Sequence, residues 1–118
     1  MQQAWLSLVL IVLVVACAPS GAPADTIKRF YTAVAAGDCE AARAELARAY
    51  QDDLERAGVS CATLLEEMQR YPLAAVDETK VDGRNPDAHL VQTRLVGRRE
   101  VVIIRVQAED GRWKIFAM

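Results

Sequence analysis

Three kinds of hydrophobic pattern follow one another along the chain. Residues 5–16 form one continuous apolar run that only Ser7 interrupts. Between residues 25 and 70 the apolar positions recur every three or four residues, which is the spacing of amphipathic helices. From residue 75 onward apolar and polar residues alternate, as they do in half-buried strands. The pattern predicts a leading apolar segment, a helical half and a sheet half.

The clearest helix is predicted over residues 25–36. Asp25 suits its N-cap, because a short carboxylate accepts from the first free amides, and Gly37 suits its end. Its apolar face is formed by residues at helical spacing: Ile27, Phe30, Tyr31 and Val34.

Two further helical stretches follow this first helix. Asp38 is a suitable cap for residues 38–57, a stretch that Gly58 ends. Ser60 is a suitable cap for a third helix over residues 61–70. The buried face of that third helix is predicted to contain Leu64, Leu65 and Met68.

The sheet half predicts four strands, at residues 75–81, 88–96, 100–108 and 112–117. Turn residues separate them: Asp82-Gly83, Gly97 and Asp110-Gly111. In the third strand one face is apolar, formed by Val102, Ile104 and Val106, and the other is mixed, formed by Val101, Ile103 and Arg105. Short turns favour an antiparallel meander, so the fold class is α+β, with N-terminal helices packed on a curved sheet.

The apolar run at residues 5–16 is too short for a bilayer span of about 20 residues. It has the length of a secretory signal core, roughly 7–15 residues, although no Lys or Arg precedes it. Val14-Val15-Ala16-Cys17 resembles the lipobox of bacterial lipoprotein signals. The resemblance implies cleavage before Cys17 and a lipid thioether on its sulfur. Residues 1–16 would then be the cleaved signal, 17–24 a lipidated tether and 25–118 the domain.

The lipobox resemblance also implies a location. The N-terminal lipid would anchor the protein to a membrane of the cell envelope, on a side that does not face the cytoplasm. In Gram-negative bacteria an Asp after the lipidated cysteine favours the inner membrane. Ala18 stands there instead, which favours the outer membrane.

Cys39 and Cys61 remain once Cys17 is assigned to lipid. An even number of cysteines in an exported chain favours a disulfide over two free thiols. A straight helix over residues 38–57 would be about 30 Å long and would hold the two cysteines apart. A disulfide needs Cα atoms within about 7 Å. We therefore predict a bend near residues 48–51.

The order of helices and strands resembles the nuclear transport factor 2-like superfamily, and in particular its small bacterial lipoprotein domains. Two motifs carry the resemblance: Ile27-Lys28-Arg29-Phe30-Tyr31 with Ala36-Gly37-Asp38, and Glu109-Asp110-Gly111-Arg112-Trp113-Lys114-Ile115. The resemblance implies a cone, in which a curved sheet wraps the first helices and a pocket opens between them. Candidate pocket-lining residues are Phe30, Tyr31, Tyr50, His89 and Trp113.

Composition excludes several function classes. A net charge of −2, from 14 basic and 16 acidic residues, gives no electrostatic case for nucleic acid. One His, and no Cys pair beyond Cys39 and Cys61, predict no metal site or cofactor. No Gly-rich phosphate loop or nucleophile elbow is found.

Three functions fit the sequence. The first is a non-catalytic envelope lipoprotein that binds a small apolar molecule or another envelope protein. The second is an isomerase or cyclase with His89 or an inward carboxylate as base, as the superfamily resemblance implies. The third is a structural or accessory subunit that forms homodimers through its sheet.

The lipid assignment predicts that Cys17→Ser abolishes acylation and membrane fractionation, because serine has no thiol to form the thioether. Intact mass and the distribution between membrane and soluble fractions measure the two effects. Unchanged fractionation would contradict the assignment.

Overall fold

The computed structural model describes residues 19–118, and these confirm the α+β fold class. Residues 1–18 lie outside the described part, and with them the predicted signal, the lipobox and Cys17. The helices are α1 (Pro23–Ala35), α2 (Cys39–Ala44), α3 (Arg48–Arg56) and α4 (Cys61–Gln69). The strands are β1 (Leu73–Asp82), β2 (Asn85–Leu95), β3 (Val102–Glu109) and β4 (Arg112–Ala117). No helix within residues 19–118 is long and apolar enough to cross a membrane.

The sheet is an antiparallel meander in the order β1-β2-β3-β4, as the short turns predicted. Its two hairpin turns, at residues 83–84 and 110–111, lie at one end of the sheet, which we call the hairpin end. The β2–β3 connection, residues 96–101, lies at the other end, which we call the loop end. The alternation on β3 is confirmed, because Ile104 and Val106 are buried while Ile103 is exposed.

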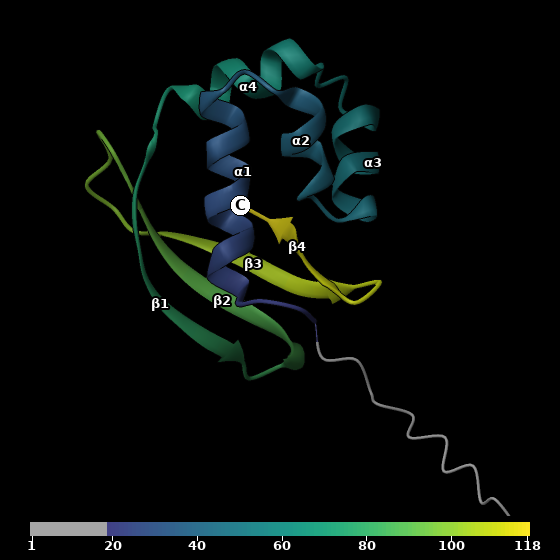
Figure 1. Cartoon of the computed structure of the whole chain (residues 1–118), viewed down its shortest axis with the longest axis vertical. Coiled ribbons are helices and arrows are strands. Elements are labelled where there is room, and N and C mark those ends of the chain that lie inside the picture. The colour runs from purple at the N-terminus through teal and green to yellow at the C-terminus, as the bar shows by residue number, and fades with distance from the viewer. Residues whose placement is uncertain (1–18) are drawn as a thin grey trace, which may run out of the picture.

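The core lies between α1 and the concave face of the curved sheet, and α1 contacts β1, β2 and β4 (Figure 1). Ile27 and Phe30 of α1 are fully buried, so their side chains fill the space between the helix and the sheet from the helix side. Fully buried sheet residues face them: Val91, Ile104, Val106 and Ile115.

The N-terminus of α1 corrects the sequence prediction. The helix begins at Pro23 rather than Asp25, and Asp25 is not the N-cap. Proline suits the first helical position, where it has no amide to leave unbonded. Asp25 acts from the first turn, where its carboxylate accepts from the Ala22 amide at 3.1 Å. At the other end Gly37 has φ +70°, and it terminates α1 as predicted.

The stretch over residues 38–57 is broken, as the disulfide required, but the predicted position was wrong. The break covers residues 45–47, and residues 48–51 are already helical in α3. Residues 45–47 leave the helix because they bond to β4. The Ala47 amide donates to the Ile115 carbonyl at 2.8 Å, and the Ile115 amide donates to the Glu45 carbonyl at 2.9 Å.

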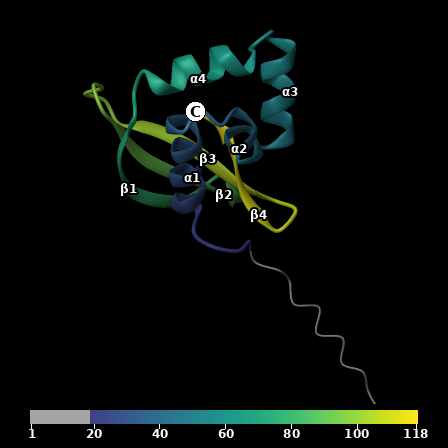
Figure 2. The same ribbon diagram turned by 45° about the horizontal axis from the view of Figure 1, so that its top comes forward.

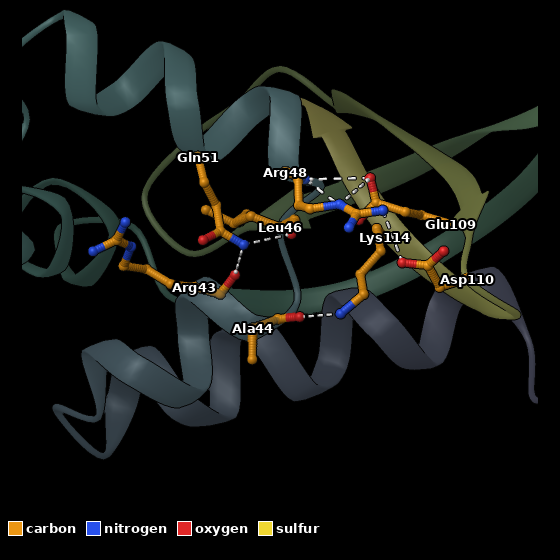
Figure 3. Close-up of polar contacts among 8 residues, drawn as sticks. All are labelled: Arg43, Ala44, Leu46, Arg48, Gln51, Glu109, Asp110 and Lys114. Carbon is orange, nitrogen blue, oxygen red and sulfur yellow. Dashed lines mark hydrogen bonds and ion pairs between the residues drawn. The ribbon is translucent and has the colours of Figure 1, made fainter.

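Side chains from α3 and β4 hold the break in place (Figure 3). The side-chain amide nitrogen of Gln51, Nε2, donates to the backbone carbonyls of Arg43 and Leu46, each at 2.9 Å. The Lys114 ammonium donates to the Ala44 carbonyl. These bonds satisfy carbonyls that lose their helical partners where α2 ends.

The first amide of α3 is bonded from the sheet. The Arg48 amide donates to the Glu109 carboxylate at 3.3 Å, and the Arg48 guanidinium pairs with Asp110 at 2.9 Å. A carboxylate at a helix N-terminus is favourable, because it accepts from a free amide and complements the helix dipole. The β3–β4 turn therefore fixes the start of α3.

Cys39 and Cys61 form the predicted disulfide, with their Cα atoms 5.7 Å apart. The bond joins the first residues of α2 and α4. It is compatible with the fold only because the chain turns back at residues 45–47.

The disulfide predicts that the double substitution Cys39→Ala and Cys61→Ala lowers the free energy of unfolding. The closed loop has a sequence separation of 22, which in the chain-entropy model is worth about 3 kcal/mol. Urea unfolding of the two proteins measures the difference. Reductant should destabilise the natural chain and leave the double variant unchanged, and equal stability of both oxidised proteins would contradict the prediction.

Candidate functional site

An open groove of about 410 Å³ lies where α1, the end of α4 and the start of β1 meet. Figure 2 shows α4 crossing above the end of α1 before the chain descends into β1. We call this groove the α1–α4–β1 groove. Its lining residues are Lys28, Tyr31, Thr32, Val34, Ala35, Met68, Gln69, Pro72 and Leu73.

Helical spacing places the α1 part of this lining. Residues 28, 32 and 35 lie three or four positions apart and therefore share one exposed stripe of the helix. Pro72 prevents α4 from continuing, so the chain turns beside the end of α1. The side-chain amide nitrogen of Gln69, Nε2, donates to the Val34 backbone carbonyl at 3.0 Å and connects the last turn of α4 to α1.

The polar groups of the groove can form hydrogen bonds or an ion pair with a ligand, but they are poorly suited to acid–base catalysis. Its nine lining residues include one ammonium, on Lys28, and no carboxylate, imidazole or thiol. Burial raises the pKa of the Tyr31 hydroxyl, the Tyr50 phenolate would raise it further, and Arg98 acts in the opposite direction. Tyr31 is therefore a neutral hydrogen-bonding group near pH 7.

Of the five candidate pocket residues, Tyr31 is the one that lines this groove. Phe30 is fully buried in the core, where its ring meets the Tyr31 ring edge-on at 5.3 Å. Tyr50 is half-buried against the core, and burial raises the pKa of its hydroxyl.

The structure brings His89 and Trp113 together, at the hairpin end of the concave face. Their rings are 4.8 Å apart and nearly perpendicular, at 80°. The Trp113 indole nitrogen donates to the Gly21 carbonyl at 3.1 Å. Trp113 therefore holds the segment that precedes α1, and it lies away from the α1–α4–β1 groove.

The inward carboxylate that an enzyme would need has one candidate in the buried set, Glu45. Its carboxylate pairs with the Arg29 guanidinium at 3.0 Å, and Arg29 also donates to the Thr26 hydroxyl at 3.1 Å. Thr26 in turn donates to the Trp113 carbonyl. These contacts link α1 to the α2–α3 break and to β4, so the carboxylate serves a structural ion pair. Residues 19–118 contain no group of three or more His, Cys, Asp or Glu that could hold a metal ion.

The outer face of the sheet bears on the homodimer hypothesis. Ile103 is 47% exposed there and lies opposite Gln92 on β2. The next outward position on β3 is Arg105. Polar side chains therefore interrupt the apolar surface around Ile103, and this face is mixed.

Most groove residues were not singled out from the sequence. Met68 was predicted to be buried, and Lys28 belongs to a motif that was used only to judge the fold. Thr32, Ala35 and Gln69 carry no local signal for a site. They become a lining only because α1 and α4 pack together across some 35 residues of sequence.

No protein-family model matches the chain, and no curated protein or solved structure matches it. The resemblance to the nuclear transport factor 2-like superfamily therefore stays a prediction from the order of elements and two short motifs of the sequence.

Proposed function

We propose that this chain is an envelope lipoprotein, anchored through lipid on Cys17, whose domain binds a small amphipathic molecule in the α1–α4–β1 groove without catalysing a reaction. The observation that carries the binding function is the groove itself, open and about 410 Å³ in volume. Small-molecule sites in proteins are typically about 300–1,000 Å³. The lipobox resemblance supports the anchor, and the Cys39–Cys61 disulfide is in keeping with an oxidising compartment.

The lining defines the chemistry of the ligand. Met68, Pro72 and Leu73 offer an apolar surface for a hydrocarbon or aromatic body. Lys28 places a positive charge at the rim, and no lining residue carries a negative charge. Charge complementarity therefore favours a ligand with an apolar body and one anionic group.

Binding is better supported than catalysis for two reasons. The space between α1 and the sheet, where the superfamily resemblance would place an enzyme pocket, is occupied by fully buried residues such as Phe30 and Ile104. His89 packs against Trp113 and lies outside the groove. A general base must reach the proton that it removes, and the groove offers none.

The groove predicts saturable binding of anilinonaphthalene sulfonate, a dye with an apolar ring system and one anionic group. Ala35→Phe should remove this binding, because the ring fills the groove from an exposed helix position. Lys28→Gln should weaken it by up to about five-fold, the worth of an exposed ion pair. Fluorescence titration of the folded protein measures both effects.

Ala57→Phe is the matched control, because Ala57 is exposed at the end of α3 and lies outside the groove lining. It should bind the dye as the natural chain does. Thermal unfolding of each variant separates a blocked groove from a loosened fold, which would bind more dye. Equal dye binding by the folded Ala35→Phe and Ala57→Phe proteins would refute the site.

A further inference from the structure

Within residues 19–118 the bonds to the sheet start at Ser20, five residues before the predicted start of the domain at residue 25. The Ser20 amide donates to the Gly111 carbonyl at 3.2 Å, and Ser20 forms a parallel bridge with Arg112 of β4. The Trp113 indole nitrogen holds the next residue, Gly21. The segment expected to be a tether is therefore bonded to the hairpin end from Ser20 onward.

This contact leaves a short connection to the lipid. Three residue steps separate Cys17 from Ser20, and an extended chain covers at most about 3.6 Å per residue. A lipid on Cys17 would hold Ser20 within about 11 Å of the attachment point. A tether of the expected length, ending at residue 24, would have allowed more than twice that reach.

The groove lies toward the opposite end of the domain. Helix α1 has 13 residues, so it is about 20 Å long. It starts beside the hairpin end and runs toward the loop end (Figure 1). The groove is lined by the later part of α1 and by Leu73, which pairs with Leu95 next to the β2–β3 connection.

We propose that the hairpin end of the domain rests on the phospholipid surface and that the α1–α4–β1 groove opens away from it, toward the aqueous space. This orientation rests on the proposed lipid anchor. It adds that the ligand reaches the groove from water and not from within the bilayer.

The short tether, and not charge, selects this orientation. The β3–β4 turn carries both signs, and Asp110 is already paired with Arg48 at 2.9 Å. Arg112 adds one exposed positive charge beside them. A surface of mixed charge has little electrostatic attraction for lipid headgroups, so the orientation should be insensitive to salt.

Trp113 is a natural reporter of this orientation. The chain has two tryptophans, Trp5 and Trp113, and cleavage before Cys17 leaves only Trp113. The acylated protein is purified from membranes and reconstituted into phosphatidylcholine vesicles that contain a headgroup nitroxide lipid. We expect strong quenching of Trp113 fluorescence.

The matched control adds a reporter at the far end. The variant Tyr71→Trp keeps Trp113 and its bond to the Gly21 carbonyl, and it places a second indole beside Pro72 and the loop end, where Tyr71 is 38% exposed. The fluorescence that this second indole adds should be quenched much less than that of Trp113. Inserting about ten Gly/Ser residues between Ala18 and Pro19 should relieve the quenching of Trp113 while the protein still floats with vesicles, because the linker is flexible.

The outcomes separate this inference from the lipid anchor. A protein that floats with vesicles but shows equal quenching at both positions, or quenching that the insertion does not change, overturns the orientation and leaves the anchor intact. A protein that carries no acyl chain and does not float overturns the anchor and the orientation with it.

Discussion

The outer edge of β4 is the constraint on which the rest of the structure depends. An edge strand leaves a row of backbone groups unpaired, and proteins cover such edges with other segments. Here two short segments cover it, through the parallel bridges of Ser20 with Arg112 and of Leu46 with Ile115. The second bridge takes residues 45–47 out of the helical stretch, and the first draws the chain before α1 onto the sheet. One strand edge thus fixes both the break between α2 and α3 and the start of the domain.

The disulfide and this edge place consistent demands on the same residues. The Cys39–Cys61 bond requires the chain to reverse between α2 and α4, and the bonds to Ile115 supply the break at which α3 turns back. The sequence revealed the need for a break, because a straight helix would hold the cysteines too far apart. It could not reveal where, since residues 45–47 contain neither Gly nor Pro. Their conformation is set by a strand some 70 residues later.

Elsewhere in the chain, too, features with local causes could be predicted from the sequence, and features that depend on distant residues could not. Several predicted features follow from neighbouring residues, and all of them are present. They are the alternation on β3, the end of α1 at Gly37, and the capping of α2 by Asp38 and of α4 by Ser60. The groove depends on how α1, α4 and β1 meet, so only Tyr31 was found among its lining residues in advance. Trp113 was a candidate pocket-lining residue. It packs against the core, and its indole nitrogen donates to the Gly21 carbonyl because the chain before α1 returns to the sheet.

Coverage of the β4 edge links the fold to the proposed function, since with the proposed lipid on Cys17 it would shorten the tether and orient the groove. The most direct test is amide hydrogen exchange, followed by NMR, on the folded domain produced from residue 18 onward. The Ser20 and Ala47 amides should be protected, because each donates to a β4-side carbonyl, Gly111 or Ile115. Exchange of Ser20 at the rate of an unstructured peptide would contradict the account, because the tether would then be long and the orientation free.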